Sequence, residues 1–237
     1  MWPTSRALLR RAGLRRGTTF LDVGCGVGDL TRKVSRLGAV ATGVDIDPGF
    51  VARARAASPG LRFECLNVCD LESLGQTYDV VYARYLLSHL PDSAEGLRAM
   101  VAATRPGGAV VVEDIDFDLH VAQPRVPAFD SYLNLYRAVV RSRGGDPHLG
   151  RHLFRLAREA GLVSPEAGLQ VRVMTTGEGK RISSLTLAGI RDSAVAGGLA
   201  TSEEIDAMLN DLRQFEEDPD TLVSVAGTYQ VWGRVVE

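Results

Sequence analysis

Three glycines occupy alternate positions, Gly24, Gly26 and Gly28, directly after the apolar residues 20–23. The pattern predicts a buried strand, a tight loop and a helix that begins at Asp29. Because glycine has no Cβ, such a loop can bend sharply and let a ligand lie against backbone N–H groups, whose partial positive charge at a helix N-terminus attracts anions. The loop is therefore expected to bind a molecule that carries a carboxylate or a phosphate.

The spacing of the third glycine separates two kinds of ligand. A dinucleotide fingerprint has a glycine or alanine three residues after its second glycine, and here that position is Asp29. Its carboxylate would face the pyrophosphate. A nicotinamide or flavin dinucleotide is therefore disfavoured.

Several motifs follow one another in an order that is known from one protein family. The motif Asp-x-Gly-x-Gly-x-Gly over residues 22–28 resembles the first motif of class I S-adenosylmethionine-dependent methyltransferases. Further matches are a strand ending in an acid over residues 40–48, a strand over 61–68, a strand and turn over 78–92, and a Pro-Gly-Gly segment before the apolar strand 109–114. The resemblance covers roughly residues 18–118 and is more specific than any single motif.

The resemblance implies a binding site for S-adenosyl-L-methionine at the ends of these strands. The glycine loop would approach the methionine part, with Asp22 near its ammonium group. Asp45 would accept hydrogen bonds from both ribose hydroxyls, as a carboxylate can. Asn67 stands where the family usually has an aspartate for the adenine amino group, and its side-chain carbonyl can accept the same bond. The full set of expected cofactor contacts is Asp22, Gly24, Cys25, Gly26, Gly28, Asp45, Ile46, Asn67, Val68, Ala83 and Arg84.

Methyl transfer from a sulfonium requires a nucleophile in line with the departing sulfur. Keeping the nucleophile and the sulfur aligned lowers the activation barrier by on the order of 7–11 kcal/mol, so a dedicated base is optional. For a hydroxyl acceptor, a carboxylate or imidazole near the strand ends could remove the proton. The candidates are His89, Asp114 and Asp116, with His120 as a fourth. The alternatives are that His89 supports a turn, that the acids are solvated or cap helices, and that His120 is a loop residue.

Tyrosines and two metal-like spacings have simpler explanations. Tyr82, Tyr85, Tyr132 and Tyr136 could line an acceptor pocket, although aromatic residues at helical spacing also serve packing. The pair His148 and His152 has no third ligand, and the pair Cys65 and Cys69 lacks a second pair. No metal site is predicted.

Strands and helices alternate through residue 114, which is typical of a doubly wound α/β fold with helices on both faces of the sheet. Together with the resemblance, this predicts a Rossmann-like seven-stranded sheet, mostly parallel with an antiparallel last strand over residues 229–234. Residues 166–174 are expected to form another strand. We treat 1–237 as a single domain with a short N-terminal helix (1–17), a cofactor-binding core (18–118) and helical cover segments (119–162 and 178–218) over the acceptor pocket.

The composition indicates which binding partners and which cellular compartment to expect. The 237 residues carry a formal net charge of −2 without a long basic run, so nucleic acid is disfavoured as a partner. The longest apolar stretches fall far short of the roughly 18 residues of a membrane span, so no membrane partner is expected. Three cysteines without a secretory signal favour the cytoplasm. The arginine-rich N-terminal stretch fits a short amphipathic helix better than a targeting peptide.

A short leader raises the question of what covers the cofactor. Only 19 residues precede the apolar strand of the first motif, whereas relatives commonly carry a longer lid there. The C-terminal insertion, a second copy of the chain in a homodimer, or a shortened start would each account for this.

The leading functional hypothesis is methyl transfer to an oxygen, nitrogen or carbon of a small molecule such as a secondary metabolite. No Asn/Asp-Pro-Pro-Tyr motif follows the fourth strand, which counts against methylation of nucleic-acid bases. Two alternatives stay open. One is an enzyme that uses the cofactor in a cyclisation or rearrangement without methylation, and the other is a catalytically silent cofactor-binding module.

Overall fold

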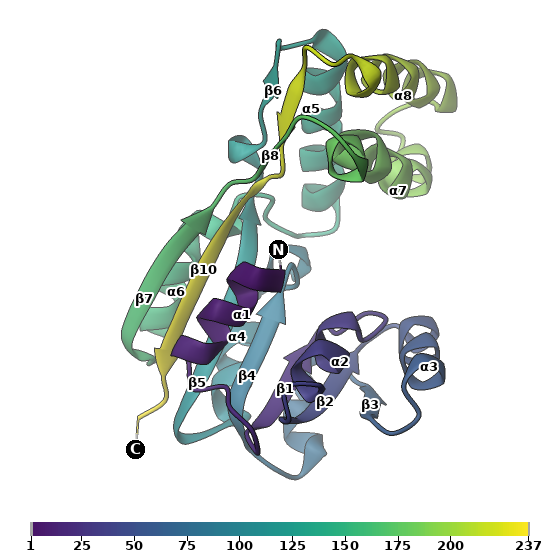
Figure 1. The fold of residues 1–237 in the computed structure, drawn as a ribbon. Coiled ribbons are helices and arrows are strands. Elements are labelled where there is room, and N and C mark those ends of the chain that lie inside the picture. The colour runs from purple at the N-terminus through teal and green to yellow at the C-terminus, as the bar shows by residue number, and fades with distance from the viewer. Residues whose placement is uncertain (1, 237) are drawn as a thin grey trace.

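One mixed sheet forms the centre of the molecule. The computed structural model describes residues 2–236, and its main sheet has seven strands in the order β3 (Arg62–Cys65), β2 (Val40–Asp45), β1 (Thr19–Val23), β4 (Tyr78–Arg84), β5 (Thr104–Asp116), β10 (Gly227–Arg234) and β7 (Val163–Gln170). The first five strands are parallel, and β10 runs antiparallel to both β5 and β7 (Figure 1). The predicted doubly wound sheet with an antiparallel last strand is confirmed.

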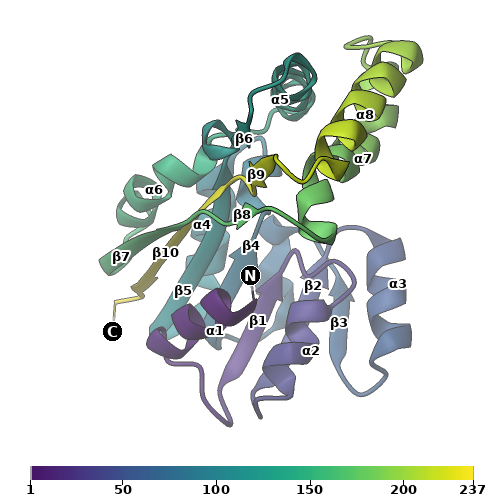
Figure 2. The ribbon, with the colours of Figure 1, turned by 45° about the horizontal axis from the view of Figure 1, so that its top comes forward.

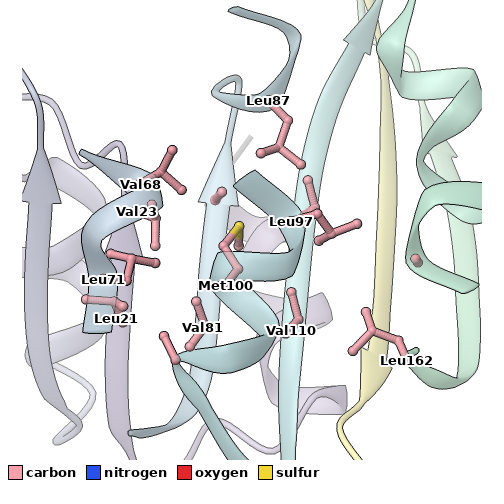
Figure 3. Packing of buried hydrophobic residues seen from close by; sticks show 14 of the residues in the cluster. Leu21, Val23, Val68, Leu71, Val81, Leu87, Leu97, Met100, Val110 and Leu162 are labelled. Atoms are coloured by element: carbon pink, nitrogen blue, oxygen red, sulfur yellow. The ribbon is translucent and has the colours of Figure 1, made fainter. Parts of the chain in front are cut away.

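Helices cover both faces of this sheet. One face carries α1 (Trp2–Arg11), α2 (Asp29–Ser35) and α3 (Pro48–Ala57), and the other carries the 3₁₀ helices η1 (Val68–Leu74) and η4 (Leu149–His152) with α4 (Ser93–Ala102) and α6 (Leu153–Glu159). Alternate residues of one strand serve the two sides, because successive strand side chains point to opposite faces. Val80 packs with α1 and α2, whereas Val81 packs with α4 (Figure 3).

Local signals fix where several helices begin. Asp47 precedes α3, and its carboxylate accepts hydrogen bonds from the backbone N–H groups of Gly49 and Phe50. Pro48 occupies the first helical position, where its missing N–H costs nothing. Thr201 and Glu204 form a reciprocal capping box that starts a later helix, α8 (Ser202–Glu217).

A second apolar core stands at the C-terminal ends of the parallel strands. It is built by α5 (Pro127–Ser142), α7 (Ile182–Ala196) and α8, with a small sheet of β6 (Ala122–Gln123), β9 (Leu222–Ser224) and β8 (Val173–Met174). We call these elements the cap. In both views the cap helices lie at one end of the main sheet (Figures 1 and 2). The short 3₁₀ helices η2 (Leu87–His89), η3 (Phe117–Leu119) and η5 (Glu178–Arg181) connect the remaining elements.

Two expectations need correction. The strand predicted over residues 166–174 is divided between β7 in the main sheet and β8 in the cap, and strands of two or three residues leave no periodic pattern to detect. The cover segment 119–162 is divided as well. Its first helix, α5, belongs to the cap, but Leu153 and Leu156 of α6 pack into the core of the main sheet. That part of the segment therefore does not cover the site.

Among residues 2–236, no helix combines the length and the apolar character needed to cross a bilayer.

Candidate active site

The glycine loop lies between the ends of β1 and β2. The N–H groups of Gly24 and Cys25 both donate to the carbonyl of Val44, at 2.8 and 2.9 Å, which holds the loop against β2. Gly28 has a φ of +78°, and a Cβ there would lie 2.7 Å from the Phe63 ring, so only glycine fits. A Cβ on Gly26 would meet no atom within 4 Å, so the loop faces open space at that point.

Asp45 at the end of β2 is held in one orientation. One carboxylate oxygen accepts from the N–H of Gly26 at 2.8 Å, and the other accepts from the N–H of Asp47 at 3.0 Å. Each oxygen keeps a further lone pair for a ligand. The carboxylate can therefore accept from two neighbouring hydroxyls, while Ile46, 66% exposed, offers apolar surface beside it.

At the expected adenine end of the site, the Asn67 side chain also has a structural role. The side-chain oxygen of Asn67 accepts from the N–H of Cys69 at 3.0 Å and so caps η1. The Asn67 side chain is exposed and keeps a second lone pair and its amide group for a ligand. Val68 is buried in the core of the main sheet, so only its backbone remains for a ligand.

A buried carboxylate and an arginine lie at the other end of the loop. Burial raises the pKa of Asp22 to about 6, although a 2.6 Å hydrogen bond from the Thr31 hydroxyl and the charge of Arg84 oppose the shift. Asp22 therefore favours a positively charged neighbour, and the half-buried Arg84 could bind a carboxylate. Together with the open loop and Asp45, these charges fit a nucleoside that carries an amino-acid tail. Ala83 is fully buried beside them and contributes packing.

A cavity of about 190 Å³ lies between the end of the main sheet and the cap. We call it the aromatic pocket, and it is lined by Tyr85, His89, Ile115, Phe117, His120, Tyr132, Tyr136, Ile182, Thr186, Val225 and Ala226. The rings of Phe117 and Tyr136 stack with centroids 3.8 Å apart. The lining contains no aspartate, glutamate, lysine or arginine.

Tyr85 connects the two halves of the site. It directly follows Arg84, whose guanidinium lies 5.5 Å from the centre of the Tyr85 ring. Its φ of +56° is unusual for a residue other than glycine. The backbone N–H donates to the Glu113 carbonyl at 2.8 Å, and the hydroxyl lies 2.9 Å from that of Thr228. These contacts hold the ring in the wall of the aromatic pocket, and strain of this kind is concentrated at functional sites.

Two histidines reach the aromatic pocket. His89, in η2, is exposed and lies on its lining. His120 is 3% exposed and packs against Phe117, Phe129 and Tyr132. Burial, together with the charge of Arg137, lowers the pKa of His120 to about 4, so its ring is neutral at pH 7.

The two candidate acids on β5 lie on the opposite face of that strand. Ile115 lines the aromatic pocket, so the alternation of side chains along β5 turns its neighbours Asp114 and Asp116 away from it. Asp114 is fully buried and accepts from the N–H groups of Ser88 and Ile115, at 3.0 and 2.8 Å. Burial raises its pKa. Its position indicates that it holds η2 against β5.

Asp116 is part of an ion network. Arg151 donates two 2.6 Å hydrogen bonds to its carboxylate and a third, at 2.7 Å, to Asp118. Burial acts to raise the pKa of Asp116, but the hydrogen bonds from Arg151, the Asp118 backbone and His148 hold it below the usual range. Asp116, Asp118 and His148 could together offer three ligands to a cation. The guanidinium already binds both carboxylates, which makes the cluster a structural ion network.

Several pocket residues give no signal in the sequence. Ile182 and Thr186 come from α7, and Val225 and Ala226 come from the segment before β10. Nothing in their spacing indicates a site, because only the docking of the cap on the sheet brings them together. Tyr132 and Tyr136 are detectable from the sequence, because a spacing of four residues places both on one face of a helix.

Comparisons with known proteins agree with this geometry. A family described as "Methyltransferase domain" matches residues 4–164. The chain is similar to ubiquinone biosynthesis O-methyltransferase from Aeromonas salmonicida (strain A449), with 39% identity over 105 residues that cover 42% of this chain and 44% of that protein. The match thus spans less than half the length of that relative.

Solved structures share the fold. The YcgJ protein from Bacillus subtilis superposes with a TM-score of 0.64 at 15% identity and covers all of both chains. Phosphoethanolamine N-methyltransferase 2 from Haemonchus contortus, solved with phosphomonomethylethanolamine and S-adenosylhomocysteine, gives a TM-score of 0.55 at 18% identity, over 99% of this chain and 52% of that one. At these identities the likeness concerns the fold alone.

The position of Asp116 predicts a stability defect for Asp116→Asn. At pH 7 the variant should lose about 1–3 kcal/mol of unfolding free energy in urea denaturation, because a buried charged acceptor of Arg151 is removed. Since the folded-state pKa of Asp116 lies below 3.8, its contribution is present above pH 4 and disappears as the pH falls through the folded value.

The matched control is Asp118→Asn, because Asp118 is 46% exposed and its ion pair is screened by water. This variant should change stability less than Asp116→Asn does. If Asp116→Asn unfolds like the wild type but has lost enzymatic activity, the structural role of Asp116 is wrong.

Proposed function

This chain belongs to the methyltransferase domain family of class I enzymes that use S-adenosyl-L-methionine, and from that premise we propose that it methylates an oxygen of a small, uncharged, ring-bearing molecule in the aromatic pocket. The observation that carries the proposal is the lining of that pocket. It combines stacked aromatic rings with histidines and hydroxyl groups and has no ionised side chain from an acid, lysine or arginine.

The cofactor half of the site follows from the residues at the strand ends. The loop of Gly24 and Gly26 would hold the methionine part, Asp22 its ammonium and Arg84 its carboxylate. Asp45 would bind the ribose, and Asn67 would bind the adenine. When bound there, the cofactor supplies an electrophilic methyl group on a positively charged sulfur.

The acceptor class follows from charge and size. A carboxylate or ammonium buried among uncharged rings would lose its hydration without a partner, which costs several kcal/mol. A cavity of about 150 Å³ is known to hold benzene, so 190 Å³ accommodates a single substituted ring. Tyr136 and Phe117 provide flat surfaces for such a ring to stack on.

The choice of oxygen rests on the relatives and on the available base. The curated relative with 39% identity over the matched segment is named as an O-methyltransferase. His89 lies at the exposed side of the aromatic pocket, where an imidazole can take up a hydroxyl proton and pass it to water. His120 is too weakly basic for this role, because its pKa is about 4. Asp114 and Asp116 face away from the pocket.

The proposal is tested with two probes that share one ring. The protein is incubated with S-adenosyl-L-methionine and either 4-methylcatechol or 3,4-dihydroxybenzoate. At the same ring position, the first probe carries a methyl group and the second a carboxylate. S-adenosylhomocysteine and a product heavier by one methylene should form with 4-methylcatechol and at least tenfold more slowly with the benzoate, since the carboxylate must be desolvated.

Other outcomes would support other functions. Preference for the charged probe would overturn the acceptor class. A product that forms without S-adenosylhomocysteine would indicate a cyclisation or rearrangement. Failure to bind S-adenosylhomocysteine in calorimetry would indicate a module whose cofactor pocket is vestigial.

The orientation of Asp45 predicts a binding defect for Asp45→Asn. The amide has no charge and offers one acceptor oxygen instead of two, and a hydrogen bond to a charged group is worth about 1.5–3 kcal/mol. Affinity for S-adenosylhomocysteine should fall roughly 10- to 100-fold in isothermal titration calorimetry. Asp47→Asn is the matched control, because asparagine also caps helices and Asp47 is assigned no ligand. Equal affinities in the two variants would refute the ribose assignment.

The buried Asp22 predicts a pH dependence of cofactor binding. Its carboxyl has a pKa of about 6 in the free protein, and an ammonium ligand favours the ionised form. Protonation therefore competes with binding, and affinity for S-adenosylhomocysteine should be about tenfold weaker at pH 5 than at pH 7. Asp22→Asn should bind more weakly and without this dependence. A wild-type affinity that stays constant over this range would rule out contact between Asp22 and the ammonium group.

A further inference from the structure

His120 and Tyr132 form a polar spot, a pair of buried polar side chains, in the wall of the aromatic pocket. Both residues line the aromatic pocket, and both are almost completely buried, at 3% and 0% exposure. Their ring centroids are 5.7 Å apart, with Phe117 and Phe129 packed around them. The spot therefore belongs to the cap side of the aromatic pocket.

Polar atoms of this spot lack partners among the described residues. The Nε2 atom of His120 lies 3.3 Å from the Ser183 hydroxyl, but its Nδ1 atom has no hydrogen-bond partner. The Tyr132 hydroxyl lies beside Thr186 without a well-formed hydrogen bond. Proteins seldom leave buried polar groups unpaired, because desolvation then goes uncompensated. One unpaired nitrogen and one poorly paired hydroxyl in the wall of one small cavity favour a ligand that pairs with them.

We propose that His120 and Tyr132 bind a second hydroxyl of the acceptor, so that the enzyme selects rings that carry two polar groups. One hydroxyl is methylated beside Tyr85 and His89, and the other is held at the spot. This inference rests on the proposed function and adds a rule for choosing among acceptors. His120 and Tyr132 act here as positioning residues.

The chemistry of the two side chains suits a hydroxyl. A neutral imidazole has one donor and one acceptor nitrogen, and a phenol can donate or accept. A hydroxyl also does both, so it can pair with either tautomer of His120. The lining of the pocket offers a charged substituent no direct counter-ion. Arg137, whose charge acts on His120, lies outside the lining and donates to Asp118.

The test compares 4-methylcatechol with 4-methylphenol, which lacks the second hydroxyl. Wild-type enzyme should show a 10- to 100-fold higher kcat/KM for the catechol, because the phenol leaves the buried polar atoms unpaired. In His120→Phe and Tyr132→Phe this ratio should fall toward one, chiefly through a higher KM for the catechol. His120→Asn, which retains a donor and an acceptor, should recover part of the ratio.

Two control variants separate recognition from packing. Phe129→Leu disturbs the same aromatic cluster without removing a polar atom, so it should change both probes alike and preserve their ratio. His152→Phe removes an exposed histidine of η4 and should leave the ratio unchanged. Calorimetry with S-adenosylhomocysteine should give wild-type affinity for every variant, which shows that the cofactor half is intact.

The outcomes distinguish this inference from the function on which it rests. If the wild type methylates both probes with equal kcat/KM, or if His120→Phe and Tyr132→Phe keep the wild-type ratio, the inference is wrong and the proposed function stands. If neither probe is methylated, and neither binds the S-adenosylhomocysteine complex in calorimetry, both are wrong.

Discussion

The hydrogen bonds between the glycine loop and the end of β2 determine how the binding edge is built. The carbonyl of Val44 accepts from two successive N–H groups of the loop, and Asp45, the next residue, accepts from a third. The loop after β1 and the acid after β2 are thus a single unit. A ligand that contacts the loop meets a carboxylate that the same backbone has already oriented, so little conformational entropy is lost in arranging it.

The two halves of the site differ in charge because they are built on different cores. The cofactor half lies at the ends of β1, β2 and β4, where strand termini expose backbone groups and charged side chains. The aromatic pocket borders the core of the cap, where Phe117, Tyr132 and Tyr136 belong to one apolar cluster. Tyr85 stands at the boundary between the two halves. The guanidinium of Arg84 lies over its ring, and the ring also lines the aromatic pocket. The charged cofactor and the uncharged acceptor that we propose can therefore be held side by side without sharing a solvation environment.

Much of the fold, and the geometry of the loop and strand end that we assign to the cofactor, could be predicted from the sequence, because each feature is encoded locally. The glycine spacing sets the loop, the acid after an apolar run marks a strand end, and Asp47 with Pro48 marks a helix start. The acceptor half could not be predicted in the same way. Val225 and Ile182 meet Tyr85 only after the cap has folded onto the sheet, and the short strands β6, β8 and β9 carry no periodic signal. The cap core arises from contacts between residues distant in sequence.

The candidate bases show that the alternation of side chains along a strand determines which residues face a pocket. Composition alone does not determine this. Asp114, Ile115, Asp116 and Phe117 are consecutive, and the sequence offers both acids as candidate bases near the end of the strand. The alternation of side chains on β5 turns Ile115 to the aromatic pocket and the acids to the other face, where Ser88 and Arg151 bind them, and Phe117 lines the pocket from η3. The carboxylates then stabilise the turn and the helical segment that border the site. Had the register of β5 differed by one residue, two negative charges would line the pocket, and an uncharged ring could not be its ligand.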